Sequence, residues 1–143
     1  MKIAVVYWSG SGNTEAMAKA AAEGVKKAGG EATIARVDEF SVSDMTGYDG
    51  FLFGCPAMGA EVLEEAEFEP FFAEAEQKLS GVPVGLFGSY GWGGGEWMRN
   101  WAERVKKDGA KLVGEGLAVE NAPNAKNLSD CEALGAEIVK ILK

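Results

Sequence analysis

The stretch Ile3-Ala4-Val5-Val6-Tyr7-Trp8-Ser9-Gly10-Ser11-Gly12-Asn13-Thr14 decides the fold of this chain. It opens with an apolar run and closes with glycines and small polar residues, and a helical pattern begins near Glu15. Glycine lets the backbone close around an anion, while the free N–H groups and the positive end of a helix attract that anion. A strand, a loop and a helix start in this order therefore predict a binding site for a phosphate group.

The phosphate loop, residues 9–14, contains no lysine or arginine, which narrows the ligands that it could hold. A nucleotide triphosphate would need the lysine of Gly-x-x-x-x-Gly-Lys-Ser/Thr, and Lys19 comes too late. The dinucleotide pattern Gly-x-Gly-x-x-Gly also fails, because Glu15 occupies the third glycine position. What remains is one phosphate held by neutral donors, or a turn whose hydroxyl groups only cap the helix. The side chains that could donate are those of Ser9, Ser11, Asn13 and Thr14.

Composition excludes several classes of protein. The chain has 143 residues, 47% of them hydrophobic, a net charge of −8 and no histidine, so we expect one domain (1–143) without histidine-based acid–base catalysis. The negative charge disfavours nucleic acid and anionic membranes as partners. No apolar stretch approaches the roughly 20 residues of a membrane span and no signal peptide is evident, so we expect a cytoplasmic protein. Cys55 and Cys131 lack metal or redox spacing and are expected to be buried, inert thiols.

Apolar segments alternate with helical patterns along the whole chain. We expect strands at residues 3–7, 32–37, 50–54, 82–88 and 110–119, the last interrupted near Gly114-Glu115-Gly116. We expect helices at residues 14–28, from about Pro70 to Gly81, at 95–107, and from the capping box Ser129-Asp130-Cys131-Glu132 onward. The predicted inward-facing residues of the helices are Phe68, Phe71, Phe72, Ala75, Leu79, Trp97, Trp101, Val105, Leu134, Ile138 and Ile141. This alternation predicts an α/β fold with a doubly wound five-stranded parallel sheet.

Three loops of unusual composition follow the first, third and fourth strands: residues 8–14, 55–63 and 89–96. Ligands of such sheets bind beyond the carboxyl ends of the strands. The third loop, Ser89-Tyr90-Gly91-Trp92-Gly93-Gly94-Gly95, sets two aromatic residues among glycines, which makes it costly to order. A planar ligand that stacks on the aromatic rings would explain this composition, and an exposed flexible loop is the alternative.

The second loop, Cys55-Pro56-Ala57-Met58-Gly59-Ala60-Glu61, offers weaker signals. Met58 provides a soft, polarizable surface for a ring face. Gly59 tolerates positive φ, so we hypothesise that the Met58–Gly59 peptide can rotate and exchange its carbonyl for its N–H. Glu61 could accept a hydrogen bond from an imide N–H. A plain turn with a capping glutamate fits the same residues equally well.

Three segments together resemble the short-chain flavodoxins of anaerobic bacteria: residues 6–18 around Ser9-Gly10-Ser11-Gly12-Asn13-Thr14, residues 54–59 and residues 85–93. The resemblance covers essentially the whole chain and implies FMN as the cofactor and the flavodoxin strand order 2-1-3-4-5, with FMN at the switch point. It implies that the phosphate loop holds the FMN phosphate, that Met58 and Trp92 flank the flavin ring, and that Glu61 accepts from its N3–H. The other cofactor-binding residues implied are Pro56, Ala57, Gly59, Ala60, Ser89, Tyr90, Gly91, Gly93 and Asn121. Relatives often carry a polar residue where Ala60 stands.

The resemblance also implies a low-potential one-electron carrier with non-covalently bound FMN, shuttling between semiquinone and hydroquinone. Turning the Met58 carbonyl toward the flavin N5 would stabilise the semiquinone, and the acidic surroundings would oppose the anionic hydroquinone. The acidic run Glu61, Glu64, Glu65, Glu67 and Glu69 is either a solvated face or a docking surface for transient, basic redox partners. We expect a monomer.

Two alternatives share a doubly wound fold. An FMN-dependent NAD(P)H:quinone reductase would need a nicotinamide site, a basic cluster for a second phosphate and room for a substrate, and none is evident. Direct bleaching of the flavin by NADPH would favour that enzyme. A phospho-receiver domain would need clustered carboxylates after the first strand and an aspartate after the third, where Trp8-Ser9 and Cys55-Pro56 stand instead.

Overall fold

Six parallel strands form the central sheet of the computed structural model, which describes residues 1–143. The strands are β1 (Lys2–Tyr7), β2 (Glu31–Arg36), β3 (Gly50–Gly54), β4 (Pro83–Tyr90), β5 (Lys111–Leu112) and β6 (Leu117–Glu120). Their order is β2-β1-β3-β4-β5, and β6 also pairs with β4. The predicted parallel sheet and strand order are confirmed. The second strand begins one residue earlier than predicted and ends at Arg36, because Val37 starts a 3-10 turn.

The expected fifth strand is divided into two short pieces. Lys111 pairs with Pro83 near the start of β4, and Leu117 pairs with Phe87 farther along the same strand. Between the pieces, Gly114 and Gly116 have positive φ values of 74° and 93°. These left-handed residues interrupt the ladder where the sequence predicted, which makes β6 an additional strand beside β4.

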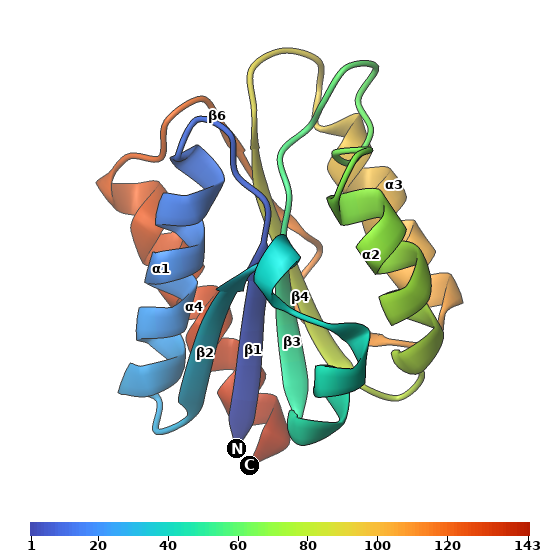
Figure 1. The fold of residues 1–143 in the computed structure, drawn as a ribbon. Coiled ribbons are helices and arrows are strands. Elements are labelled where there is room, and N and C mark those ends of the chain that lie inside the picture. Colours follow the sequence, from blue (N-terminus) through green and yellow to red (C-terminus); the bar gives the residue numbers. More distant parts are fainter.

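Helices cover both faces of the sheet. They are α1 (Asn13–Lys27), α2 (Phe68–Ala75), α3 (Glu96–Lys107) and α4 (Ala125–Leu142). Figure 1 shows α1 and α4 together on one side and α2 and α3 on the other. In β1, Ile3 and Val5 join the core with α1 and α4, whereas Val6 joins the core with α2 and α3. Because both faces are covered, β1 is apolar at nearly every position rather than at alternate ones.

Two helix predictions were wrong in detail. The last helix begins at Ala125, because Asn124 caps it by accepting from the Asn127 N–H at 2.8 Å, and the predicted box at Ser129 lies inside the helix. Of its predicted inward residues Ile138 is buried, but Ile141 is 48% exposed in the last turn. The helix predicted to end at Gly81 ends at Ala75 and continues as a 3-10 turn to Lys78. Its Phe71 is only partly buried.

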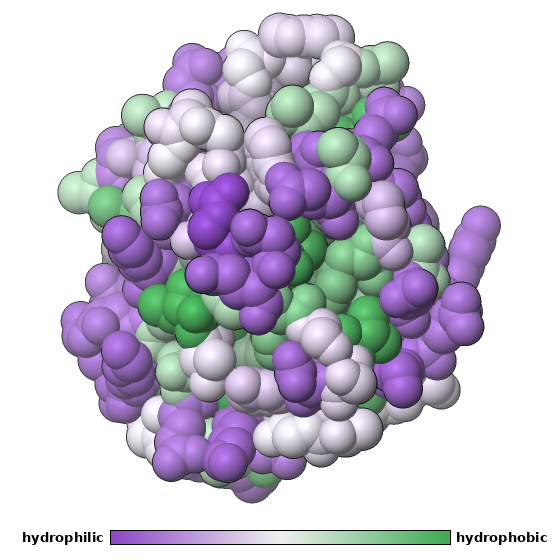
Figure 2. Space-filling view, in the orientation of Figure 1, coloured by the Kyte–Doolittle hydropathy of each residue, from purple (hydrophilic) through white to green (hydrophobic).

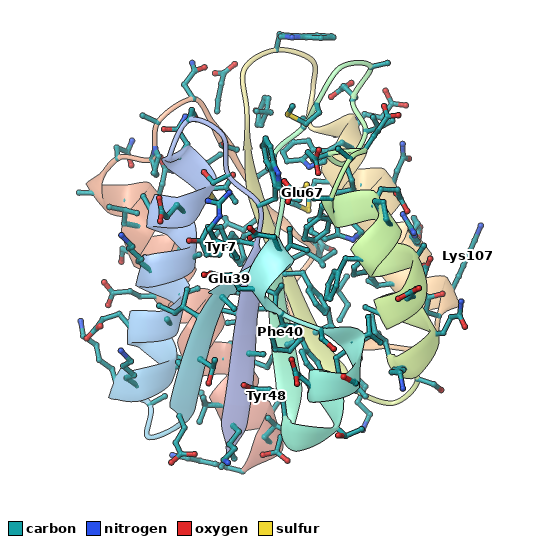
Figure 3. All side chains as sticks on the ribbon, viewed as in Figure 1. Tyr7, Glu39, Phe40, Tyr48, Glu67 and Lys107 are labelled. Carbon is teal, nitrogen blue, oxygen red and sulfur yellow. The ribbon has the colours of Figure 1, made fainter.

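Between β2 and β3 the chain forms two 3-10 segments, Val37–Glu39 and Val42–Gly47, in place of a long helix. Figure 3 shows Phe40 and Tyr48 from this region against the front of the sheet. Their rings lie 5.7 Å apart between centroids and pack on the core beneath α2 and α3. Figure 2 shows that hydrophobic surface on this side is broken up by hydrophilic residues.

Both cysteines are buried and free, as predicted. Burial raises the pKa of the Cys55 thiol far above its usual range and that of Cys131 to about 12, so both remain protonated thiols. None of the helices has the length and apolar composition needed to cross a membrane.

The strand order brings the three unusual loops together. Because β1 pairs with β3 and β3 with β4, the loops that follow these strands meet at one edge of the sheet. Figure 1 shows them gathered at the top of the molecule, with both chain termini at the opposite edge. The expectation that these loops are neighbours is therefore confirmed.

Candidate functional site

A cavity of about 350 Å³ lies where the three loops meet, within the size range of small-molecule sites. It is lined by Trp8, Ser9, Gly10, Ser11, Asn13, Pro56, Ala57, Met58, Ser89, Tyr90, Gly91 and Asn121. No charged side chain is among them. The cavity therefore combines neutral hydrogen-bonding groups at one end with apolar and aromatic surface from the other two loops.

A larger hollow of about 840 Å³ lies elsewhere, along β2 and the 3-10 segments. Its charged lining carries both signs, for example Lys2 and Lys26 beside Glu39 and Asp44. None of the residues predicted to bind a cofactor lines it. Size alone therefore does not identify the functional site, and the cavity at the three loops is the better candidate.

The phosphate loop keeps its donors available. Gly12, at φ 96°, occupies the N-cap position of α1, and no side chain caps that helix. The Gly12 N–H donates to the Ser9 hydroxyl at 3.1 Å, and the hydroxyl groups of Thr14 and Ser89 lie 3.3 Å apart. The alternative that these hydroxyls only cap the helix is thus not what the structure shows. An anion at this end would meet the free N–H groups of the first turn of α1.

The second loop is fixed at both ends. The Cys55 sulfur accepts from the Glu64 N–H at 3.3 Å, and the Glu64 carboxylate accepts from the N–H groups of Ala66, Glu67 and Phe68, each at 2.8 Å. Burial raises the pKa of this carboxyl, but the backbone donors outweigh burial and leave the pKa below its usual value. Glu64 is therefore a structural anion that starts α2, with only 7% of its surface exposed.

Between these ends, residues 58–62 form a tight turn. The Met58 N–H donates to the Val62 carbonyl at 2.8 Å, and the Val62 N–H donates to the Met58 carbonyl at 3.0 Å. Gly59 and Glu61 both have positive φ, at 50° and 56°. Rotation of the Met58–Gly59 peptide would therefore break a backbone hydrogen bond. The next peptide, Gly59–Ala60, makes none and can rotate at lower cost.

Glu61 leans toward the third loop rather than into the cavity. Its Oε1 accepts from the Glu96 N–H at the start of α3, at 3.2 Å, while its Oε2 makes no hydrogen bond. A Cβ on Gly93 would lie 2.5 Å from the Glu61 carboxyl carbon and the backbone φ there is 87°, so this glycine lets the carboxylate lie directly against the third loop. Trp92, in the same loop, is 67% exposed. Glu61 thus binds the start of α3 rather than capping its own turn, and one oxygen stays available for another donor.

The structure brings most of the predicted site residues together around the cavity, but some lie at its rim or behind it. Those that do not line it are Gly12, Thr14, Gly59, Ala60, Glu61, Trp92 and Gly93. Trp8 lines the cavity and was not predicted as a site residue. The sequence did contain a signal for Trp8, because it stands between a buried strand and Ser9. The alternation of side chains along the strand places its indole on the side of the sheet that α2 covers.

Most of the chain matches known proteins of one family. A sequence model of the flavodoxin family matches residues 5–135. The flavodoxin of Megasphaera elsdenii is 47% identical over 134 residues, covering 92% of this chain and 98% of that protein. The flavodoxin of Clostridium beijerinckii is 44% identical, covering 96% and 99%. The solution structure of the two-electron reduced M. elsdenii flavodoxin has a TM-score of 0.87 at 46% identity, covering 96% and 98%.

An FMN-binding electron carrier, not an enzyme, is the class of protein that this fold and these relatives define. The chain belongs to the flavodoxin family. The residues of the cavity fit the cofactor: neutral donors and a helix start face one end, and Met58 and Tyr90 supply flat or polarizable surface at the other. The predictions of FMN and of electron transfer are therefore confirmed.

Proposed function

We propose that residues 1–143 form one FMN-binding domain that carries single electrons at low potential between partner proteins. The observation that carries this proposal is the cavity itself, which three loops close without any cationic side chain. A basic residue at the phosphate or the ring would stabilise added negative charge, and its absence has the opposite effect. The neutral lining thus supports a strongly reducing cofactor.

In this proposal each loop holds a different part of FMN. Residues 9–14 bind the phosphate through backbone N–H groups and hydroxyls, with Gly10 and Gly12 leaving room for it. Met58 contacts one face of the ring, and Trp92 covers the other after the glycines around it let its exposed indole turn inward. The free Oε2 of Glu61 accepts the imide N–H. The remaining residues proposed to contact the cofactor are Pro56, Ala57, Gly59, Ala60, Ser89, Tyr90, Gly91, Gly93 and Asn121.

Bound FMN supplies two successive one-electron steps. The Gly59–Ala60 peptide, which is free of hydrogen bonds, can present either its carbonyl or its N–H to the cofactor without breaking the turn. Glu61 and the net charge of −8 oppose the step that adds net negative charge. These residues therefore separate the two steps and lower the potential of the second.

The surface around the cavity suits transient docking. Of the acidic run, Glu65 and Glu67 are exposed, whereas Glu64 binds backbone and Glu69 pairs with Arg104 at 2.7 Å. The docking surface that we propose for basic partners is therefore smaller than the sequence predicted. Met58, Val62 and Trp92 add exposed apolar area at the same edge. Such small mixed surfaces are typical of weak redox complexes, which fits a monomer that meets its partners briefly.

The test is an anaerobic titration of the FMN-loaded protein with dithionite, followed by absorption. We expect two separate one-electron steps, the second at strongly negative potential, and no bleaching when NADPH is added instead. An apoprotein that does not take up FMN, or a single two-electron step, would overturn the proposal. Direct reduction by NADPH would favour the quinone reductase.

A further inference from the structure

Trp8 forms part of the cavity wall at the phosphate end. It follows β1 directly, and its N–H donates to the Gly54 carbonyl at 3.0 Å, which extends the pairing of β1 and β3 by one residue. Its side chain points to the side of the sheet that α2 covers and packs on the core there. The indole is therefore attached to the hydrogen-bonded end of a strand, at the point where the phosphate loop begins.

The indole touches the phosphate loop on one side and α2 on the other. A Cβ on Gly10 would lie 3.0 Å from the Cη2 atom of Trp8, so the ring lies directly against this glycine. The Trp8 Nε1–H donates to Glu67 Oε1 at 3.0 Å. Figure 3 shows Glu67 between the upper end of β1 and the start of α2. This is the one side-chain hydrogen bond between the first loop and the α2 segment.

Glu67 is itself well placed to hold the ring. Its backbone N–H donates to the buried Glu64 carboxylate at 2.8 Å, so its position is fixed by the same anion that starts α2. Its side chain is otherwise exposed and makes no salt bridge. The carboxylate therefore has a single bonded partner, the indole N–H.

We propose that Glu67 fixes the Trp8 indole as a wall that orders the phosphate loop, so that both are positioning residues for FMN binding. This inference rests on the proposed placement of the FMN phosphate at residues 9–14. Gly10 and Gly12 give that loop many conformations, and a fixed surface against Gly10 reduces the entropy lost when the ligand orders it.

The negative charge of Glu67 allows its positioning role to be distinguished from a purely electrostatic effect. FMN carries a phosphate dianion, so a nearby carboxylate repels it, and removing that carboxylate should tighten binding if charge alone matters. The positioning role predicts the opposite sign, because the indole loses its hydrogen bond. A glutamine at this position would remove the charge and keep an oxygen that can accept from the indole N–H.

The experiment measures FMN dissociation constants of apoprotein at pH 7 and 0.1 M salt, by quenching of flavin fluorescence. We expect Glu67→Ala and Trp8→Phe to weaken binding about five- to tenfold, in line with the loss of one charged hydrogen bond. Glu67→Gln should bind as tightly as the parent protein or more tightly. The control is Glu65→Ala, which removes a neighbouring exposed carboxylate without a hydrogen bond and should tighten binding slightly.

The double variant Trp8→Phe with Glu67→Ala should bind no more weakly than the weaker single variant, because one interaction is lost only once. Glu67→Ala binding as tightly as Glu65→Ala would overturn the inference, whatever Trp8→Phe does to folding. Fully additive losses in the double variant would also overturn it. If the parent apoprotein does not bind FMN, the proposed function fails instead.

Discussion

Asp108 ends α3 beside two other carboxylates that share a single arginine. Arg104 donates to both oxygens of Glu69 and both oxygens of Glu76, at 2.7–2.8 Å. The third carboxyl, Asp108, has an oxygen that is buried without a hydrogen-bond partner and stands at the negative end of a helix. Burial, followed by its contact with Glu76, raises the pKa of Asp108 from 3.8 to about 6.

This shift makes folding depend on pH in a defined window. A carboxyl whose folded pKa is raised binds its proton more tightly when folded, so its contribution is fully present below about pH 4 and lost as pH rises through 6. About two units correspond to roughly 3 kcal/mol, and partial exposure of the side chain reduces this to about 1–2 kcal/mol. The chain contains no histidine, so no imidazole group titrates in this window. The hydrogen bond from Arg104 lowers the pKa of Glu76, so this carboxyl affects stability only at lower pH.

The assay is urea unfolding of apoprotein at pH 5.0 and pH 7.5. We expect the free energy of unfolding to fall by about 0.5–1 kcal/mol between them, because roughly half of the contribution is already lost by pH 5.0. Asp108→Asn should remove most of this fall and should be more stable than the parent at pH 7.5, because the amide can donate to Glu76 without a charge. Glu103→Gln, an exposed neighbour on α3, is the control and should leave the fall unchanged. A parent protein equally stable at both pH values, or a less stable Asp108→Asn at pH 7.5, would refute the reasoning.

Three further predictions concern the loops. Glu64→Ala should lower the free energy of unfolding by about 1–3 kcal/mol, because three backbone donors at the start of α2 lose their acceptor, as urea unfolding at pH 7 would measure. Gly93→Ala should weaken FMN binding several-fold, because a Cβ would meet the Glu61 carboxyl at 2.5 Å and the backbone φ is 87°; fluorescence titration tests this against Gly94→Ala, whose Cβ meets only Arg99 at 4.0 Å. Neutralising Glu65 and Glu96 together should raise the potential of the second electron by about 10–30 mV per carboxylate at low salt, measured by spectroelectrochemistry, and an unchanged potential would contradict the electrostatic account.

The parts of this fold that were predictable depend on local patterns. Buried parallel strands are continuous apolar runs, and residues 3–7, 50–54 and 82–88 stand out for that reason. The phosphate loop is equally local, because the strand, the glycines and the helix start follow each other directly. The start of α4 was not predictable in this way. Two capping signals, at Asn124 and Ser129, lie within five residues of each other, and only packing of the whole helix selects between them.

The contacts between loops could not be predicted from local sequence. The Glu61–Glu96 bond joins residues 35 apart in the chain, and the Trp8–Glu67 bond joins residues 59 apart. The local sequence shows the composition of each loop. It does not show which side-chain rotamer forms a hydrogen bond to the next loop. The sequence therefore identified most of the residues that surround the cavity, but it missed Trp8 and could not show which of the side chains form hydrogen bonds within the protein itself.

Glu61, Glu64 and Glu69 show why this difference matters for an acidic carrier. In the sequence Glu64 and Glu69 looked like surface charge and Glu61 like a cofactor ligand or a cap of its own turn. In the structure Glu61 binds the start of α3, Glu64 binds the start of α2, and Glu69 binds Arg104. Their charges are held in place by donors, so they act on a bound cofactor with fixed geometry and respond little to salt. Glu65 faces solvent without a hydrogen-bond partner, and salt there screens the attraction of a partner. The bound carboxylates therefore act on the potential at any salt concentration, whereas the exposed ones act on the potential and on docking only at low salt. Ionic strength should change the association rate far more than the potential.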